Sequence, residues 1–370
     1  MIPLSVRGLR RYSRQLIVPE IGLQGQQRLG NSRVLVVGAG GLGSPALQYL
    51  AAAGVGRIGI ADGDVVDETN LQRQTLFATA DVGRNKASVA AERLHALNPL
   101  IAVDPIVTDV DEHNVRELVR LYDVVLDCTD RFPARYLIND ACVLEGKPDV
   151  YGSIFRFDGQ VSVFGAGGPC YRCLYPEAPP PGSVPTCAEG GVLGALAGIV
   201  GAWQASEALK FLLGAGKLLR GRLMLIETLN ARVREIQFAR DPACALCGDA
   251  PTIADVRAIE YDDDDAREGI DEIEPAALDA ALRSARLLDV RERHEIVLGT
   301  LDGSVNIPAS QLEARMHELD SAQRYVVACR VGVKSRWAAQ RLQEAGFARL
   351  AHLHGGLLAY AAQHPDFEFY

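Results

Sequence analysis

One stretch, residues 33–64, constrains the fold of this 370-residue chain more than any other. It reads as a short β-branched strand, a glycine loop, a helix and a second strand that leads into Asp62. Gly38, Gly40 and Gly43 form a G-x-G-x-x-G pattern, which lets a backbone turn tightly and approach a phosphate. Asp62 stands where a carboxylate can hydrogen-bond ribose hydroxyls. The stretch predicts nucleotide binding, but the pattern alone fits a nicotinamide oxidoreductase equally well.

The helix of this stretch has recognisable ends. Ser44 is a good N-cap, and Pro45 suits a first helical position, where a missing N–H costs nothing. The predicted helix runs to Ala53, and Gly54 serves as its left-handed stop.

Charge and composition exclude several classes of partner. The net charge of −9 argues against nucleic acid and against an anionic membrane. No apolar run approaches the roughly 20 residues of a membrane span, and the first residues lack a signal-peptide core, so we expect a cytoplasmic protein. Eight cysteines in such a chain indicate metal binding or reactive thiols rather than a disulfide framework.

Three groups suited to a triphosphate follow Asp62, namely Asn70, Arg73 and Lys86. An enzyme that cleaves ATP needs such groups, because charge moves onto the departing pyrophosphate. Taken singly, each also fits a surface salt bridge. Arg14 lies earlier, in a basic helical segment that the residues alone predict to be a solvated helix packed on the domain.

Further strands are expected at 101–107 and 123–127. They place Asp130 near the carboxyl edge of the sheet, where it is either a Mg²⁺ ligand or the N-cap of the next helix. A hairpin at 150–164, turning at Asp158-Gly159, predicts a sheet that is parallel first and antiparallel later.

Two C-x-x-C pairs supply a complete tetrathiolate set for structural zinc, formed by Cys170, Cys173, Cys244 and Cys247. A redox role is disfavoured, because neither pair is expected to open a helix after a strand. Between the pairs lies a proline-rich loop, 176–191, in which Cys187 precedes an apolar helix predicted at 192–213. An exposed thiol near a helix N-terminus tends to be nucleophilic, so we favour a functional role over an incidental cysteine.

Domain boundaries follow from composition. Residues 1–248 form a nucleotide-binding domain, 249–270 an acidic linker, and 271–370 a smaller α/β unit. In that unit Cys329 stands between a buried strand and a helix. The following loop is expected to aim backbone N–H groups at its sulfur and to stabilise a thiolate or persulfide. A phosphatase-like loop is disfavoured, because Ser335 stands where that loop has its arginine.

These motifs carry a family resemblance. Residues 9–248 resemble the ThiF/MoeB adenylyltransferases that activate ubiquitin-like sulfur carrier proteins, through RYSRQ, GAGGLGS, ADGD, TNLQRQ, GRNK, LDCTD, CYRC and CALC. Residues 273–363 resemble a rhodanese domain, through LLDVRE, GSVNIP, CRVGVKS and HLHGGLLAY. The resemblance implies a Rossmann-like adenylation domain with structural zinc, followed by a rhodanese domain. It leaves the pathway open among molybdopterin, thiamine, tRNA thiolation and thio-metabolites.

The resemblance also implies residue roles. An ATP site is implied at Gly38, Gly40, Gly41, Gly43, Asp62, Asn70, Arg73, Lys86, Asp130 and Arg131. Catalytic roles are implied for Arg14, Arg73, Lys86, Asp130, Cys187 and Cys329, with Mg²⁺ on Asp130. Arg14 matches an arginine that reaches the ATP of the other subunit of a homodimer, which reverses the solvated-helix interpretation. A persulfide loop is implied at Arg330, Gly332, Lys334 and Ser335.

The implied substrates are ATP, a carrier protein ending in Gly-Gly and a sulfur donor, either a cysteine desulfurase or thiosulfate. The carrier carboxylate would attack the α-phosphate, and a Cys329 persulfide would attack the resulting acyl-adenylate. Cys187 would form a disulfide in the step that releases the thiocarboxylated carrier. The second domain departs from its family at Lys334, commonly arginine, and at Tyr360, commonly tryptophan. The alternative is an adenylyltransferase whose second domain only docks partners.

Overall fold

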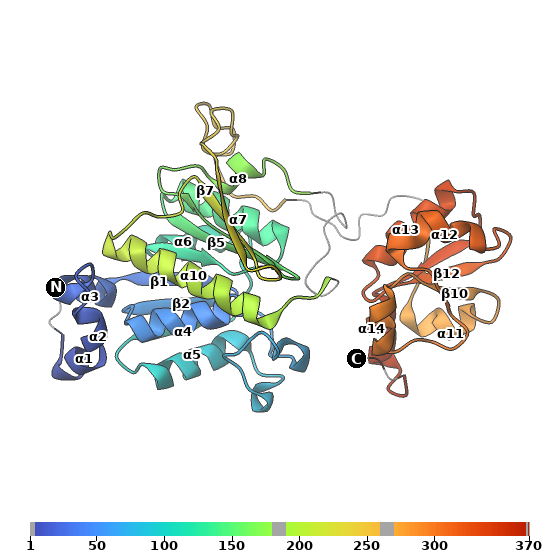
Figure 1. The fold of residues 1–370 in the computed structure, drawn as a ribbon, viewed down its shortest axis with the longest axis horizontal. Coiled ribbons are helices and arrows are strands. Elements are labelled where there is room, and N and C mark those ends of the chain that lie inside the picture. The colour runs from blue at the N-terminus through green and yellow to red at the C-terminus, as the bar shows by residue number, and fades with distance from the viewer. Residues whose placement is uncertain (1–3, 180–189, 260–269, 368, 370) are drawn as a thin grey trace. The chain divides into compact units, whose positions relative to one another are not determined.

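A computed structural model of the protein describes residues 4–179, 190–259, 270–367 and 369. The chain forms two compact units, one of residues 1–178 and 190–260 and one that includes residues 261–370. Figure 1 shows their labelled elements. Among the described residues, no helix combines the length and the apolarity that crossing a membrane requires. Each unit has a sheet of its own.

The first unit is built on one mixed sheet in the order β3-β2-β1-β4-β5-β6-β7-β8. Neighbouring strands are parallel from β3 to β5 and antiparallel from β5 to β8, so the predicted mixed sheet is confirmed. The strands are β1 (Arg33–Val37), β2 (Arg57–Ala61), β3 (Ala102–Ile106), β4 (Val124–Asp127), β5 (Pro148–Phe155), β6 (Asp158–Gly165), β7 (Arg222–Glu227) and β8 (Arg232–Gln237).

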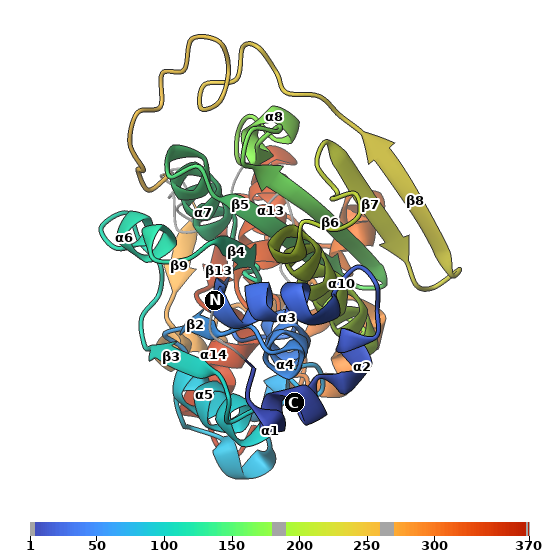
Figure 2. The same cartoon turned by 90° about the vertical axis from the view of Figure 1, so that its left-hand side faces the viewer.

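Helices cover both faces of this sheet. The α-helices are α1 (Val6–Arg11), α2 (Ser13–Leu16), α3 (Gly22–Asn31), α4 (Gly43–Ala53), α5 (Lys86–Leu97), α6 (Val115–Arg120), α7 (Phe132–Leu144), α8 (Tyr171–Leu174) and α10 (Gly194–Leu213). Figure 2 shows α6 and α7 on one side of the strands and α4 and α10 on the other. Short 3₁₀ helices, η1 (Glu68–Asn70) and η2 (Thr79–Asp81), precede α5.

The central strand β1 contributes to two cores. Val34 and Val36 belong to the apolar cluster that includes residues of α4, α5 and α10. Leu35 and Val37 belong to the cluster that includes residues of α6 and α7. Successive side chains of a strand point to opposite faces, so a strand covered on both faces needs an unbroken apolar run. This explains why the run after Arg33 contains no polar residue.

The turn from β1 into α4 depends on close backbone approaches. Gly38 has φ 92°, and a Cβ on Gly43 would lie 1.9 Å from the Gly38 carbonyl oxygen, so neither position accepts a side chain. The prediction that Ser44 is the N-cap is wrong. Because the Ser44 N–H already donates to the Gly40 carbonyl, at 2.9 Å, the helix begins at Gly43, and the Ser44 hydroxyl donates to the Ala39 carbonyl instead. The predicted stop is confirmed, since Gly54 is left-handed with φ 83°.

The β5–β6 hairpin turns earlier than predicted. Phe155 pairs with Asp158, so Arg156 and Phe157 form the turn, with Arg156 at φ 52°. Gly159 lies inside β6 because α10 approaches the sheet there. A Cβ on Gly159 would lie 2.6 Å from the Val200 side chain. Gly159 therefore allows α10 to pack closely against the sheet, and the Asp158-Gly159 pair does not form the turn.

The second unit is a five-stranded parallel sheet in the order β11-β10-β12-β13-β9. Its strands are β9 (Asp271–Ile273), β10 (Arg286–Asp289), β11 (Val305–Asn306), β12 (Tyr325–Ala328) and β13 (Leu350–Leu353). Its α-helices are α11 (Leu278–Ala281), α12 (Leu312–Arg315), α13 (Val333–Glu344) and α14 (Gly356–Gln363), with short 3₁₀ helices η3 (Pro275–Ala277), η4 (Arg293–Leu298), η5 (Ala309–Gln311) and η6 (Met316–Glu318). Two apolar clusters form its core.

Candidate active sites

The glycine loop and Asp62 form one connected structure in the first unit. Asp62 is 8% exposed, and its carboxylate accepts the backbone N–H of Ala39 at 2.7 Å and that of Asp64 at 2.9 Å. Burial raises the pKa of the Asp62 carboxyl, while these N–H groups and Lys86 oppose that shift. The carboxylate is therefore fixed beside the loop that is expected to hold phosphates.

The TNLQRQ segment packs against the same loop. The Arg73 side chain is next to Gly41, where a Cβ would lie 3.4 Å from the arginine Cγ. Asn70 accepts hydrogen bonds through its Oδ1 from Arg73 at 3.2 Å and from Gln74 at 2.9 Å. Gln74 is 3% exposed, its Nε2 faces Gly40, and its Oε1 has no hydrogen-bond partner within the described residues. The structure thus brings Asn70 and Arg73 to the glycine loop, and it adds Gln74, which the sequence reasoning missed.

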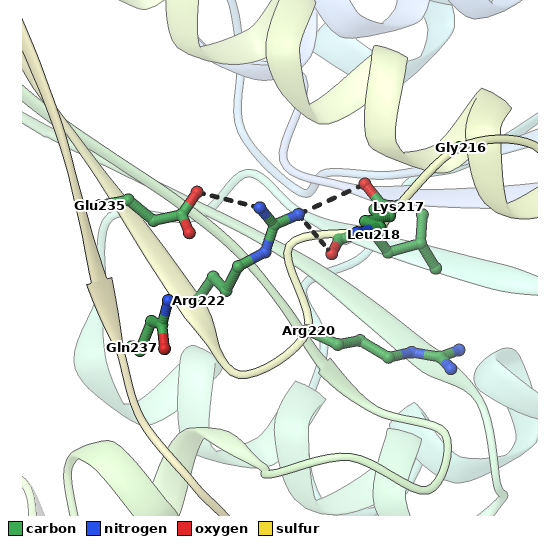
Figure 3. A pocket seen from close by; sticks show the side chains of 7 residues that line it. All are labelled: Gly216, Lys217, Leu218, Arg220, Arg222, Glu235 and Gln237. Carbon is green, nitrogen blue, oxygen red and sulfur yellow. Dashed lines mark hydrogen bonds and ion pairs between the residues drawn. The ribbon is translucent and has the colours of Figure 1, made fainter.

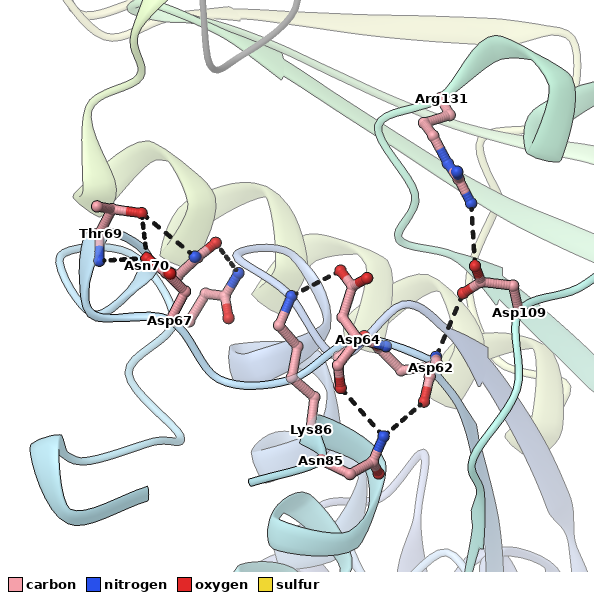
Figure 4. Close-up of polar contacts among 12 residues, drawn as sticks. Asp62, Asp64, Asp67, Thr69, Asn70, Asn85, Lys86, Asp109 and Arg131 are labelled. Atoms are coloured by element: carbon pink, nitrogen blue, oxygen red, sulfur yellow. Dashed lines mark hydrogen bonds and ion pairs between the residues drawn. The ribbon is translucent and has the colours of Figure 1, made fainter. Parts of the chain in front are cut away.

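Lys86 is held by an aspartate that the sequence reasoning did not single out. Its Nζ lies 2.9 Å from Oδ2 of Asp64, as Figure 4 shows. The lysine side chain is 7% exposed and that of Asp64 is 69% exposed. Asn85 caps α5 through the Ser88 N–H and donates to the Asp64 carbonyl, which joins the start of α5 to the end of β2. Asp64 therefore fixes the ammonium group at the mouth of the site.

Asp130 lies exposed just after β4, at the carboxyl edge of the sheet. The N-cap of α7 is Arg131, so Asp130 does not fill the capping role that was its alternative interpretation. An exposed carboxylate at this edge fits Mg²⁺ bound beside phosphates. Arg131 is also exposed, and its guanidinium lies 3.4 Å from the Asp109 carboxylate.

A buried polar network supports the chain before Asp130. Arg135 is 7% exposed and donates to the Thr129 carbonyl and to the Ser153 hydroxyl, both at 3.1 Å. The carboxyls of Asp127 and Asp149 are at most 2% exposed, and each has one oxygen without a hydrogen-bond partner among the described residues. Burial raises the pKa of both carboxyls. The network fixes the backbone that carries Asp130.

The two C-x-x-C pairs come together. Sγ–Sγ distances are 3.8 Å within the first pair, and between the pairs 3.6 Å for 170–244, 3.3 Å for 173–247 and 3.4 Å for 170–247. Four thiols at such distances surround one point and fit tetrahedral zinc. One detail of the prediction is wrong, since Cys170 is the N-cap of the one-turn helix α8. The gathering of all four sulfurs supports zinc over a redox pair.

Two predicted residues are not part of these clusters. Arg14 lies exposed on α2. Cys187 lies outside the described residues. The helix that follows its loop is α10, and Gly194 approaches the TNLQRQ segment so closely that a Cβ there would lie 2.2 Å from the Gln72 carbonyl oxygen. The other two cysteines of this unit that the structure describes, Cys128 and Cys142, are buried.

In the second unit, Cys329 follows β12 and is 1% exposed. Its Sγ accepts the Gly332 N–H at 3.1 Å and lies 3.6 Å from the Ser335 Oγ. Gly332 has φ 95°, and that left-handed turn aims its N–H at the sulfur. Helix α13 begins at Val333, so its N-terminus also faces the sulfur. The predicted N–H contact with the sulfur is thus confirmed at Gly332, and it fits the predicted role of the loop in holding a thiolate or persulfide anion.

Two cations accompany the loop. Lys334, predicted to lie in the loop, belongs to the first turn of α13, and its Nζ lies 3.8 Å from the Glu295 carboxylate. Arg330 follows the cysteine directly, and its guanidinium lies 5.7 Å from the centre of the Phe369 ring. Positive charge on residues of this loop fits its predicted role in holding an anion.

A surface cavity of the first unit lies elsewhere, between the segment after α10 and the β7–β8 hairpin (Figure 3). Arg222 lines it and donates to the Glu235 carboxylate at 3.0 Å and to the Leu218 carbonyl at 2.8 Å. None of the residues predicted for the ATP site lines this cavity. This cavity is therefore separate from the nucleotide site that the sequence predicts at the glycine loop.

Comparison with known proteins agrees with this geometry. Residues 12–246 match the ThiF family and residues 274–363 match the rhodanese-like domain. The "Probable adenylyltransferase/sulfurtransferase MoeZ" of Mycobacterium tuberculosis is 45% identical over 386 residues, covering 99% of this chain and 96% of that protein. A "Sulfur carrier protein adenylyltransferase" of Thermus thermophilus is 54% identical over 250 residues, covering 66% of this chain and 92% of that protein.

Among solved structures, that of E. coli MccB with MccA-N7isoASN superposes with a TM-score of 0.58 at 24% identity, covering 64% of this chain and 74% of that chain. At this identity the likeness shows a shared fold.

Proposed function

The chain belongs to the ThiF family and carries a rhodanese-like domain, and on this premise we propose that it converts the C-terminal carboxylate of a sulfur carrier protein to a thiocarboxylate. It is an adenylyltransferase and a sulfurtransferase. The observation that carries the proposal is that one chain holds both sites. One is a glycine loop with Asp62, Arg73 and Lys86, and the other is a cysteine whose sulfur accepts the Gly332 N–H.

The first reaction is adenylylation. The carrier carboxylate attacks the α-phosphorus of ATP, and pyrophosphate leaves from a carrier–AMP anhydride. Negative charge grows on the pyrophosphate, so Arg73 and Lys86 stabilise the transition state, while Asp62 orients the ribose. Asp130 would hold Mg²⁺, which would add positive charge beside the phosphate oxygens. The four cysteines would hold zinc in a structural role.

The second reaction is sulfur transfer. The terminal sulfur of a Cys329 persulfide attacks the acyl-adenylate carbonyl, AMP leaves, and the carrier becomes joined to Cys329 through an acyl disulfide. The Cys187 thiolate then attacks the Cys329 sulfur, which forms a Cys187–Cys329 disulfide and releases the thiocarboxylate. A thiol reductant restores both cysteines. The persulfide comes from a donor such as thiosulfate or a cysteine desulfurase, and the setting is cytoplasmic.

We also place Arg14 in a homodimer. Support comes from exposed apolar side chains on the same N-terminal helices and on α4, namely Val6, Ile17, Leu23 and Tyr49, which are 52–73% exposed. A second copy that covers them would remove this surface from water. Mixing Arg14→Ala and Lys86→Ala chains tests the arrangement. Activity returning to about a quarter of wild type indicates that Arg14 acts across the dimer, because half of the dimers then contain one intact site. No recovery contradicts it.

The decisive experiment is the intact mass of a Gly-Gly carrier incubated with enzyme, Mg-ATP and thiosulfate. Wild type should replace one carrier oxygen by sulfur. Cys329→Ala should give carrier–AMP without sulfur, and Cys187→Ala should accumulate the carrier joined to the enzyme. If Cys329→Ala still yields thiocarboxylate at the wild-type rate, the sulfurtransferase role is wrong. If no carrier–AMP forms with either chain, the adenylyltransferase role is wrong for that carrier.

A further inference from the structure

One aromatic ring of the second unit contacts two arginines at the persulfide loop. The guanidinium carbon of Arg291 lies 5.3 Å from the centre of the Phe369 ring, and that of Arg330 lies 5.7 Å from it. Both distances are within the range of cation–π attraction. Arg330 is the residue next to Cys329, so Phe369 touches the loop without belonging to it.

The ring is held in place by a row of aromatic side chains. Tyr360 is 5% exposed and donates to the Asp279 carboxylate at 2.7 Å. Its ring meets that of Phe367 edge to face at 5.4 Å, and Phe367 stacks on Phe369 at 5.7 Å. Both phenylalanines pack against the apolar cluster to which Tyr360 belongs. The position of Phe369 is therefore set by the core of the unit.

Arg291 gives the ring a rigid neighbour. It is 1% exposed, its guanidinium is paired with the Asp289 carboxylate at 2.6 Å, and it donates to the Gly299 carbonyl at 2.7 Å. A buried guanidinium with these partners has little freedom to move. Phe369 thus contacts both a fixed cation and the cation of the loop.

The backbone of Arg330 is also fixed. Its carbonyl accepts the Leu358 N–H at 3.0 Å, and Gly356 packs so closely that a Cβ there would lie 2.5 Å from the Arg330 carbonyl oxygen. With the backbone held, the ring contact restrains the long side chain. An aromatic face adds no negative charge to the cation that it contacts, so this contact does not itself reduce the attraction of the guanidinium for anions. A carboxylate in the same place would weaken that attraction.

We propose that Phe369 is a positioning residue that restrains the Arg330 guanidinium as a binding group for a small dianionic sulfur donor of the thiosulfate class. The inference rests on the proposed sulfurtransferase function and names the donor chemistry of that site. The Cys329 thiolate attacks the sulfane sulfur of thiosulfate, a new S–S bond forms, and the S–S bond of the donor breaks. Sulfite leaves with the electron pair, so one thiolate and one dianion become one persulfide anion and one dianion.

The test uses the full chain and measures the initial rate of Cys329 persulfide formation against thiosulfate concentration, by intact mass. Phe369→Leu should raise the KM for thiosulfate about threefold to tenfold, the worth of one cation–π contact, and change kcat less than about twofold. The inhibition constant of sulfate, an inert dianion, should rise by the same factor. Phe369→Tyr keeps an aromatic face and should stay near wild type.

Two further variants separate positioning from general damage. Phe367→Leu is the matched control, because Phe367 belongs to the aromatic row, whereas the two cation–π contacts are made by Phe369. It should leave the KM for thiosulfate within about twofold of wild type. Arg330→Gln should raise that KM at least as much as Phe369→Leu does, and the double variant should be no worse than Arg330→Gln alone, since both changes remove one restrained cation.

Each of the following outcomes overturns the inference. If Phe369→Leu loads sulfur faster or with a lower KM, the ring hinders access of the donor to the loop and does not position Arg330. The double variant could lose affinity additively, or Phe367→Leu could match Phe369→Leu, and either result would separate the ring from Arg330. If wild type itself takes no sulfur from thiosulfate but loads from a desulfurase, the donor class is wrong while the proposed function stands. If wild type loads from neither donor, the sulfurtransferase function is wrong as well.

Discussion

The nucleotide site of the first unit and the persulfide loop of the second unit are built in opposite ways. The predicted nucleotide site combines the backbone of the glycine loop with side chains from the end of β2, the η1 segment and the start of α5. Contacts such as Lys86–Asp64 join these groups. The second is a short run after β12 in which the Gly332 N–H and the start of α13 face one sulfur. We infer that side-chain changes act strongly on the first site, whereas the second depends mainly on its cysteine and its backbone.

The largest effect that would sharpen this comparison concerns zinc. Cys244→Ser should lower the zinc content of the chain and destabilise the first unit by more than about 4 kcal/mol, because the remaining thiolates no longer close a tetrahedral site. Metal analysis and calorimetry measure both quantities, with Cys142→Ser as a buried cysteine outside the cluster. Unchanged zinc content in Cys244→Ser would show that the cluster does not hold the metal.

Next in size is the loss of the buried lysine. Lys86→Ala should slow carrier-dependent ATP–pyrophosphate exchange by about 10²–10³, since charge on the leaving pyrophosphate is no longer neutralised. Persulfide formation on Cys329 from thiosulfate should stay at the wild-type rate in the same chain. An equal loss of both activities would show that the two sites do not act independently. The exposed Lys217, which is not among the residues predicted for the ATP site, offers a control that leaves exchange unchanged.

A smaller effect is expected at the partner of that lysine. Asp64→Asn should raise the KM for ATP about threefold to tenfold and change kcat less, because Lys86 then loses its restraint but keeps its charge. Steady-state kinetics with a saturating carrier measure this split. Glu117→Gln, a change to an exposed carboxylate on α6, serves as the control. A fall in kcat alone, at unchanged KM, would show that Asp64 acts in the chemical step.

The smallest effect concerns pH. Burial raises the folded-state pKa of Asp149 well above its usual value, so the folded chain keeps a proton that the unfolded chain releases. Stability of the first unit should therefore fall as pH rises from the unfolded pKa toward the folded one. Asp149→Asn should flatten that fall and stabilise the unit by about 1 kcal/mol at neutral pH. Urea unfolding across pH measures it, with the exposed Asp158→Asn as control. A steeper fall in Asp149→Asn contradicts the assignment.

The sequence predicted the parts of both sites that depend on local order. Gly38, Gly43 and Gly332 stand next to strands whose apolar runs are plain, so their loops could be placed from the chain alone. The cysteine pairs could be matched because four thiolates at this spacing have few other uses. The resemblance then supplied roles for Arg73 and Lys86 that no single residue indicates.

Other features depend on contacts between distant segments. Gln74 and Asp64 looked like ordinary polar loop residues, and only the folded chain brings them to Gly40 and Lys86. The Asp158-Gly159 pair has the composition of a turn, but the approach of Val200 places Gly159 in a strand. Close packing therefore determines the local structure where the conformational preferences of the residues are ambiguous.

The thiol cluster also has a consequence for the order in which the chain folds. Its two pairs are separated by 74 residues, so bringing them together closes a long loop, and the entropy of that closure must be offset by contacts made within it. Strands β7 and β8 lie inside the loop and pair with each other, and β7 also pairs with β6, which ends just before the loop begins. The newly made chain should therefore bind its metal after the antiparallel half of the sheet has formed. The bound ion then slows the unfolding of the contacts that formed before it arrived.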